Sequence, residues 1–162
     1  MTRHTRSVFL LGTMFATAVV GAAEPPAPPP GSAATYASSQ EIAARLAAAI
    51  AMPSDPALAP IAVTDQYSIH EVHRGKAAPP AVHVGWTELH FILDGSATFT
   101  TGGKITGSAG GATIEGGISR KVQKGDAVIV PPNTPHWYNQ VGGSLTYLEV
   151  RFIAPTATTQ RN

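Results

Sequence analysis

The stretch Gly125-Asp126-Ala127-Val128-Ile129-Val130-Pro131-Pro132-Asn133-Thr134-Pro135-His136 decides the fold class of this chain. Its pattern predicts a tight turn, a short apolar strand, a second turn stiffened by proline, and a histidine at the start of another strand. Far upstream, His83, Glu88 and His90 offer partners for that histidine. A histidine and a carboxylate brought together from distant segments of a β-rich chain indicate a built site.

From about Ile61 onward the sequence alternates with a period of two, as β-strands do. Short runs rich in β-branched and aromatic residues are separated by Gly, Pro, Asn and Asp, and they predict strands at Tyr67–Val72, Ala81–Trp86, Glu88–Leu93, Ala97–Thr101, Ala127–Val130, His136–Gln140 and Leu145–Ile153. Asp94-Gly95 predicts a hairpin turn between two of them. The segment from Thr101 to Gly117 carries seven glycines and predicts a long loop or an irregular hairpin. Because no helical pattern interrupts the strands, we expect an all-β barrel or two-sheet sandwich.

Residues 1–23 have the layout of a secretory signal peptide. Arg3 and Arg6 precede an apolar run that ends at Val20 and is short for a membrane span, and small residues up to Ala23 allow cleavage. We therefore expect an exported protein, periplasmic or secreted, that has no membrane contact after cleavage; an uncleaved N-terminal anchor is the alternative. The chain has no cysteine, so an exported domain must rely on its own core rather than on disulfides.

The rest of the chain divides into four segments. Residues 24–37 are rich in Pro and Ala and predict an extended spacer. Residues 38–60 contain a helix and its connection, residues 61–154 the β-domain, and residues 155–162 a flexible tail. Eleven basic residues against ten acidic ones, with no basic stripe, argue against nucleic acid and anionic membranes as partners.

The predicted helix begins at a capping box. Ser38 and Glu41 have the spacing at which each side chain caps the other's backbone N–H. An apolar stripe at i, i+4 and i+8 follows on an alanine-rich background and consists of Ile42, Leu46 and Ile50. Pro53 ends the pattern. We expect an amphipathic helix packed on the outside of the domain.

Side-chain alternation predicts that polar residues gather on one face of neighbouring strands. On the strand at Glu88–Leu93 the polar face carries Glu88, His90 and Ile92. The opposite face is apolar, and we expect it to be the core face against a second layer; it carries Leu89, Phe91 and Leu93. The polar face should line a cavity, together with three residues from two other predicted strands: His83, His136 and Tyr138.

Imidazole and carboxylate groups that converge from separate strands suit a divalent transition metal. Zn, Fe, Mn, Ni and Cu all accept such ligands, and the general order of metal affinities cannot choose among them from ligand identity alone. Three or four protein ligands would leave positions open for water or substrate, as a catalytic site requires.

The order His83-x4-Glu88-x6-Gly95 followed by Gly125-x5-Pro131-x-Asn133-x2-His136 resembles the two motifs of the cupin superfamily. The resemblance spans roughly residues 61–153. It implies a small double-stranded β-helix (jelly-roll) barrel with one metal ion inside, and it gives the ligand role to His83, Glu88 and His136.

The chain departs from the family pattern in two ways. The first motif usually has a further histidine two residues before the one at His83, where this chain has Ala81, and residue 85 is glycine. The glycine of the second motif is replaced by Asn133, which tolerates the left-handed backbone of such a turn. One expected ligand is therefore missing.

His90 and Tyr138 are the candidates to complete the site. His90 lies two residues beyond Glu88 on the same face, where it either binds the metal or forms a hydrogen bond to a neighbour. Tyr138 either caps the site with its hydroxyl group or packs in the core. In an enzyme, these two residues would orient the substrate or move a proton.

Several other polar and aromatic residues weigh less. His70 and His73 have opposite parity on one strand, so at least one should lie at the surface or rim. Glu149 and Arg151 share a face and are expected to form a solvated ion pair. Trp86 and Trp137 are expected to pack first and to line a pocket mouth second.

Two functions follow from the sequence. The first is an exported cupin that binds a divalent metal and a small organic ligand, with dioxygenase, decarboxylase or isomerase activity if it is an enzyme. The second is a metal-free module that binds or senses a small molecule without catalysis. A homodimer is a further expectation, since dimers are common among proteins that resemble this one. The sequence leaves open whether the protein is an enzyme, and it names no substrate.

Overall fold

The computed structural model describes residues 31, 33–108 and 110–154. The expected signal peptide at residues 1–23, most of the expected spacer at residues 24–37 and the expected tail at residues 155–162 lie outside the described residues. All helices and strands named below belong to one compact unit that begins at Thr35. Within the described part of the chain, no helix is long and apolar enough to cross a membrane.

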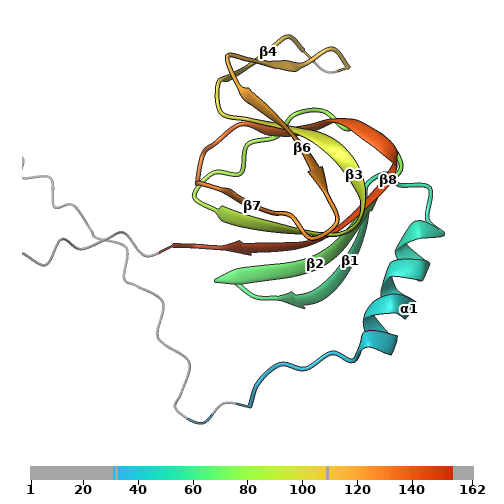
Figure 1. The fold of residues 1–162 in the computed structure, drawn as a ribbon. Coiled ribbons are helices and arrows are strands. Elements are labelled where there is room, and N and C mark those ends of the chain that lie inside the picture. Colours follow the sequence, from blue (N-terminus) through green and yellow to red (C-terminus); the bar gives the residue numbers. More distant parts are fainter. Residues whose placement is uncertain (1–30, 32, 109, 155–162) are drawn as a thin grey trace, which may run out of the picture. The chain divides into compact units, whose positions relative to one another are not determined.

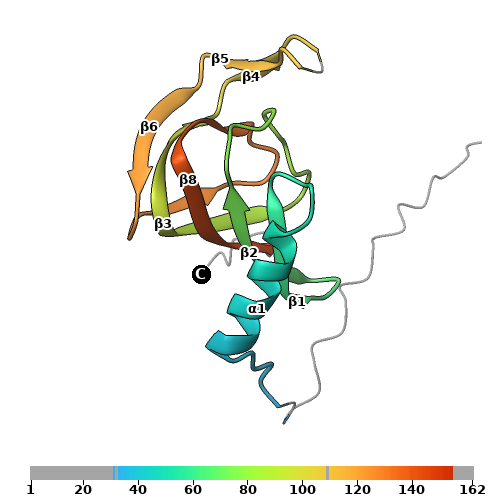
Figure 2. The same ribbon diagram turned by 90° about the vertical axis from the view of Figure 1, so that its right-hand side faces the viewer.

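The predicted helix is confirmed as α1, Ser39–Ile50. The Ser38 Oγ atom accepts a hydrogen bond from the Glu41 backbone N–H at 3.2 Å, and the Glu41 carboxylate accepts from the Ser38 N–H at 2.8 Å, as the capping box predicts. No residue of α1 is buried. Its apolar stripe borders a groove whose other wall includes Leu93 and Leu148, and Figure 2 shows the helix outside the barrel.

In the part of the chain that the structure describes, eight strands follow α1, and the paired strands run antiparallel. They are β1 Ala57–Val63, β2 Tyr67–Arg74, β3 Thr87–Thr101, β4 Lys104–Thr106, β5 Thr113–Glu115, β6 Ile118–Gln123, β7 Ala127–Val130 and β8 His136–Phe152. The main sheet has the order β1-β2-β8-β3-β6, with β7 also paired to β3. Figure 1 shows β3 and β8 curving around a common interior. The expected all-β jelly-roll barrel with one short helix is confirmed.

The longest strands each contain two of the strands that the sequence predicted separately. The predicted hairpin turn at Asp94-Gly95 is wrong, because β3 bends there and keeps its pairing with β8 on both sides. Gly95 has a φ of 79° and lies so close to the β8 backbone that an added Cβ would be 2.0 Å from the Ser144 carbonyl oxygen. Glycine therefore allows a close approach between two strands rather than a chain reversal.

The predicted strand at Ala81–Trp86 is also wrong. Only Ala81 forms a bridge, with His136, and the chain then turns at Val84 and Gly85. The side chain of Val84 is 79% exposed, so these residues do not alternate between two faces. Strands β1 and β6 are not among the strands that the sequence predicts. β1 begins at Ala57, before the change of period at Ile61, and β6 is mostly exposed and polar.

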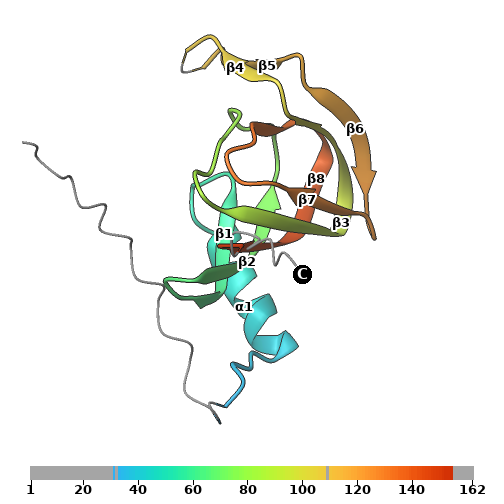
Figure 3. The same ribbon diagram turned by 90° about the vertical axis from the view of Figure 1, so that its left-hand side faces the viewer.

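The glycine-rich segment from Thr101 to Gly117 forms an irregular hairpin, one of its two predicted forms. Strands β4 and β5 pair antiparallel in a small sheet of their own. Figure 3 shows this hairpin at one end of the barrel, between β3 and β6.

The barrel interior is both the core and the wall of the site. The buried apolar cluster consists of Val72, Ile92, Ala97, Phe99, Val122, Val130, Tyr138, Leu145 and Tyr147. Glu88 and His90 point to the same side as Ile92, and each is 1% exposed. The expectation that Leu89, Phe91 and Leu93 form the core face is wrong, because Phe91 is 41% exposed and Leu93 borders the α1 groove. The sheet curves onto itself, so its concave face is the core, and α1 borders part of its convex face.

Candidate metal site

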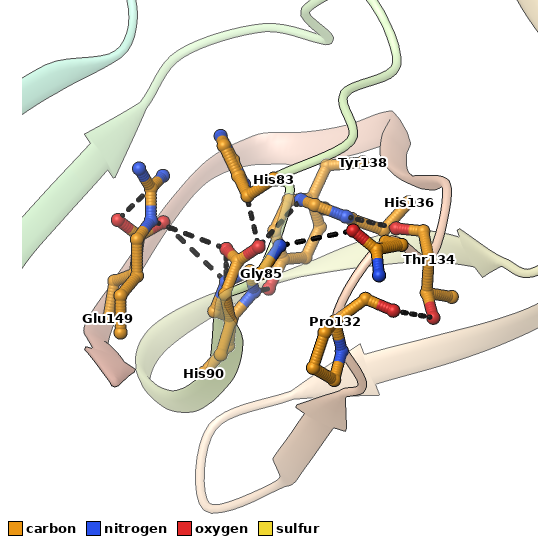
Figure 4. Close-up of polar contacts among 11 residues, drawn as sticks. His83, Gly85, His90, Pro132, Thr134, His136, Tyr138 and Glu149 are labelled. Atoms are coloured by element: carbon orange, nitrogen blue, oxygen red, sulfur yellow. Dashed lines mark hydrogen bonds and ion pairs between the residues drawn. The ribbon is translucent and has the colours of Figure 1, made fainter. Parts of the chain in front are cut away.

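Backbone hydrogen bonds join the two motif segments. Ala81 and His136 exchange two N–H···O bonds of 3.0 Å, and the Asn133 N–H donates to the His83 carbonyl at 3.3 Å. The Gly85 N–H donates to the Asn133 side-chain oxygen at 3.0 Å, and a dashed line from Gly85 marks this bond in Figure 4. Asn133 has a φ of 61°, which confirms the left-handed turn expected of it. These hydrogen bonds hold His83 beside His136.

His83, Glu88 and His136 converge inside the barrel. Their nearest ligand atoms all lie within 4.8 Å of one another. The Glu88 Oε1 atom is 2.6 Å from His83 Nδ1 and 3.7 Å from His136 Nε2. Glu88 and His136 are buried, whereas the side chain of His83 is 28% exposed. The structure thus brings together the three residues to which the motifs assign the ligand role.

The protonation of this group is set by its surroundings. His136 Nδ1 lies 3.0 Å from the Thr134 carbonyl oxygen and must donate its hydrogen there, so Nε2 carries the lone pair that faces Glu88. Burial lowers the pKa of His136 and keeps the imidazole neutral. Burial alone would raise the pKa of Glu88, but hydrogen bonds from His83 and His90 hold it well below its usual range. An ionised carboxylate beside a neutral imidazole is the state that a metal ion requires.

The spacing of these atoms fits a transition metal. Two ligand atoms that each lie about 2.0–2.2 Å from one ion, at angles of about 90–110°, are about 2.8–3.6 Å apart. The observed 2.6 Å and 3.7 Å fall just outside the two ends of that range. Small side-chain adjustments therefore suffice, and nitrogen and carboxylate ligands are compatible with Zn, Fe, Mn, Ni or Cu.

His90 belongs to a second group rather than to the first. Its Nε2 atom lies 3.3 Å from a Glu88 oxygen and 3.5 Å from a Glu149 oxygen, so it must carry the hydrogen. Its Nδ1 atom then accepts from the Tyr138 hydroxyl at 3.0 Å (Figure 4). Glu88, His90 and Glu149 also have ligand atoms within 4.8 Å of one another. Both ring nitrogens of His90 have hydrogen-bond or ion-pair partners. This agrees with the expected role of a histidine that is hydrogen-bonded to a neighbour.

Cross-strand register explains this second group. Glu149 on β8 lies between His70 on β2 and His90 on β3, and Arg151 is paired in the same way with Glu88. The Arg151 guanidinium lies 3.0 Å from Glu149 and 3.5 Å from Glu88. The expectation of a solvated ion pair is wrong for the carboxylate: Glu149 is only 4% exposed and lies in the barrel interior, whereas the Arg151 side chain is 29% exposed. The shared parity of Glu149 and Arg151 is visible in the sequence, but their neighbours are not.

The other candidate residues lie on the strand faces that side-chain alternation predicts or in the wall of the cavity. Tyr138 directs its hydroxyl inward, as expected, and burial raises its pKa. His73 bonds Thr146 on the face of β2 opposite to Val72, and the buried Nδ1 atom of His70 has no hydrogen-bond partner among the described residues. Trp137 lines the cavity and donates its indole N–H to the Ala78 carbonyl.

A cavity of about 210 Å³ adjoins both groups. Its wall includes His83, His90 and His136 on one side. Arg74, Tyr147 and Trp137 supply other parts of the wall. The sequence missed Arg74 entirely, because a lone arginine at a strand end carries no motif.

The sequence of this chain matches a known family. The sequence model of a family described as "Cupin domain" matches residues 68–151, more than half of the chain. This chain belongs to the cupin family. No curated protein matches it as a relative.

Solved structures agree with this fold. The cupin is similar to a protein with a double-stranded β-helix domain from Klebsiella pneumoniae, at 17% identity and a TM-score of 0.50, over 64% of this chain and 82% of the other. It is also similar to TT1209 from Thermus thermophilus, at 18% identity and a TM-score of 0.49, over 64% and 89%. At 17% identity the likeness to the Klebsiella protein shows the fold and leaves the activity to be argued from the site.

Proposed function

We propose that this cupin binds one divalent transition metal ion through His83, Glu88 and His136, and that the adjoining cavity takes a small organic molecule. The observation that carries the proposal is the tautomer of His136. Because Nδ1 donates to the Thr134 carbonyl, the lone pair on Nε2 faces the ionised carboxylate of Glu88. A backbone carbonyl that accepts from one ring nitrogen and so orients the other is the usual support of a histidine metal ligand.

The cavity chemistry favours an open metal centre over a covalent mechanism. A bound ion would supply Lewis acidity or an oxygen-binding centre, as dioxygenase, decarboxylase or isomerase chemistry requires. The chain itself supplies the Tyr138–His90 hydrogen bond, which can hold a proton at the cavity wall. None of the described residues that line the cavity is serine, threonine, cysteine or lysine, so these four common nucleophiles are absent from the described wall.

A metal-free binding module is the second candidate. One observation favours it: the 2.6 Å contact between His83 and Glu88 satisfies both groups without an ion. Ala81, at the place of a fourth ligand, points to the same alternative.

Metal analysis of the purified protein tests the proposal. We expect one equivalent of metal after loading with Fe, Mn, Zn, Ni or Cu in turn and removal of the excess. His136→Ala should lose it, because the oriented nitrogen is gone. His73→Ala, on the opposite face of β2, is the matched control and should retain it. A wild-type protein that stays metal-free after reloading establishes the second candidate instead.

His90→Ala separates the two groups of the interior. We expect it to keep the metal, because His90 Nε2 faces Glu88 and Glu149 rather than the His83–His136 side. Loss of the metal in this variant would move His90 onto the ligand list.

We also propose that the protein works outside the cytoplasm. The charged and apolar residues before Ala23 support export. Expression of the full chain, followed by N-terminal sequencing of the periplasmic and medium fractions, should give a chain that begins after Ala22 or Ala23. A homodimer stays a prediction, and sedimentation velocity of that material would check it.

A further inference from the structure

One cavity arginine has no carboxylate partner. Arg74 is the last residue of β2, and its side chain lines the cavity. Its Nε–H donates to the Tyr147 hydroxyl at 3.0 Å, and no ion pair among the described residues includes it. The terminal amino groups of its guanidinium have no hydrogen-bond partner in the described part of the chain. Donors of this kind facing a cavity are available to a ligand.

Two aromatic rings hold this guanidinium in place. The Arg74 Cζ atom lies 5.5 Å from the centroid of the Tyr138 ring and 5.8 Å from that of Tyr147. Both distances are within the range of cation–π attraction. Burial raises the pKa of Tyr147 to about 12, so its hydroxyl stays neutral and keeps accepting from Arg74. The donor fork is thus oriented before any ligand arrives, which reduces the ordering entropy lost on binding.

The other cavity arginine behaves differently. Arg151 is paired with both Glu88 and Glu149, so these two carboxylates are shared with an internal cation. Arg74 has no such partner among the described residues. Its charge and that of Arg151 together offset the charges of the two carboxylates. A divalent ion at His83, Glu88 and His136 would add two further positive charges and make the cavity electrostatically complementary to an anion.

We propose that the cavity binds a small carboxylic acid as its anion, with the carboxylate accepting hydrogen bonds from the terminal amino groups of Arg74. A planar guanidinium presents two parallel donors that match the two oxygens of a carboxylate. The cavity of about 210 Å³ is smaller than the roughly 300–1,000 Å³ of sites for drug-sized ligands. Trp137 and Tyr138 in the wall suit a flat or short apolar body. This proposal specifies the class of the small organic molecule in the proposed function. It depends on that function only for the metal ion that would lie near the ligand.

Calorimetric titration with matched probes tests this inference. The probes are propionate, benzoate and succinate, each compared with its amide, which has a similar shape but no charge. We expect at least one carboxylate to bind the metal-loaded protein and its amide to bind at least tenfold more weakly. Equal binding of acid and amide, or no binding by any of the three acids, overturns the proposal.

Variants assign the binding to Arg74. Arg74→Gln removes the charge and should raise the Kd of the carboxylate about ten- to a hundredfold, the range expected for losing charge-assisted hydrogen bonds. Arg74→Lys should fall between this variant and wild type, since it restores the charge without the fork. Arg120→Gln on β6 removes an exposed arginine of equal charge and should bind as wild type. An unchanged Kd in a folded Arg74→Gln protein contradicts the assignment.

Metal content keeps the two proposals apart. Arg74 is not in the ligand group, so Arg74→Gln should retain the wild-type metal content. If the wild-type protein binds no metal but still binds a carboxylate through Arg74, the metal proposal fails and this one stands. If metal is stoichiometric and no carboxylate binds, the reverse holds.

Discussion

At the scale of single residues, the hydrogen-bond partners of each interior histidine decide which of its two ring nitrogens carries the hydrogen. His136 donates from Nδ1 to a backbone carbonyl and keeps Nε2 as an acceptor. His90 is oriented the opposite way, with Nε2–H between two carboxylates and Nδ1 bonded to Tyr138. Two buried histidines therefore present different atoms to the carboxylates of the interior: His136 faces Glu88 with the lone pair of Nε2, and His90 faces Glu88 and Glu149 with its Nε2–H.

Tyr138→Phe tests this division at the residue scale. The exchange leaves the buried Nδ1 atom of His90 without its donor, which should lower the free energy of unfolding by about 1–3 kcal/mol. Metal content should stay at the wild-type value, because the Tyr138 hydroxyl donates to His90 and not to the His83–Glu88–His136 group. Urea unfolding of the chelator-treated protein gives the first quantity and elemental analysis the second.

The exposed Tyr36, 84% accessible, supplies the control. Tyr36→Phe should change neither stability nor metal content. A Tyr138→Phe protein as stable as wild type would show that the hydrogen bond to His90 contributes nothing in solution, and loss of metal would place Tyr138 in the metal site.

At the scale of elements, the turn before β8 positions the residues of the candidate metal site. Asn133 supplies both a left-handed backbone with a φ of 61° and an acceptor for the Gly85 N–H. Asn133→Ala loses both, and the left-handed backbone alone costs a non-glycine residue about 1–2 kcal/mol. Asn133→Gly loses only the hydrogen bond. We expect the alanine variant to be less stable than the glycine variant in urea unfolding, with weaker metal binding in both because His83 is less firmly held.

The opposite order of stability would contradict this account of the turn. Thr134→Ala is a nearby control, since its backbone carbonyl still accepts from His136 and its hydroxyl group makes only a long bond of 3.4 Å to Pro132.

Elements set by local chemistry were predictable from the sequence, and elements set by distant contacts were not. The capping box of α1 and the turn at Asn133 depend on neighbouring residues and were predicted correctly. The strand at Ala81–Trp86 was predicted wrongly, because hydrogen bonds to Asn133 and His136 decide its path. The turn at Asp94-Gly95 was also wrong, because β8 pairs with both halves of β3, with shifts of register on either side of these two residues.

At the scale of the whole molecule, the barrel concentrates ionisable groups in its interior. Burial is the largest cause that lowers the pKa of His70 and of His136, with Glu149 opposing the shift at His70 and Arg151 adding to it. The folded protein therefore takes up protons on these rings less readily than the unfolded chain, whose histidines titrate near about 6.5. Stability is full above that pH and decreases as the pH falls through it, because the unfolded state then binds more protons.

His70→Gln should reduce this acid destabilisation. Urea unfolding of the metal-free protein between pH 8 and pH 5 should give a smaller decrease in the free energy of unfolding for the variant than for wild type. His73→Gln, the same exchange on the opposite face of β2, is the matched control. An identical pH dependence in the His70→Gln and wild-type proteins would show that His70 is free to protonate in the folded barrel.

The sequence by itself determined the β-rich fold class, the capped helix, the left-handed turn and the three motif residues His83, Glu88 and His136. These features depend on local spacing and backbone preference. Only the tertiary structure decided which face of β3 is the interior, how His90 is bonded, and that Arg74 and the Glu149–Arg151 pair lie at the cavity. The physical reason is cross-strand register: β2, β3 and β8 are far apart in sequence, and a shift of one residue would turn every one of these side chains to the other face.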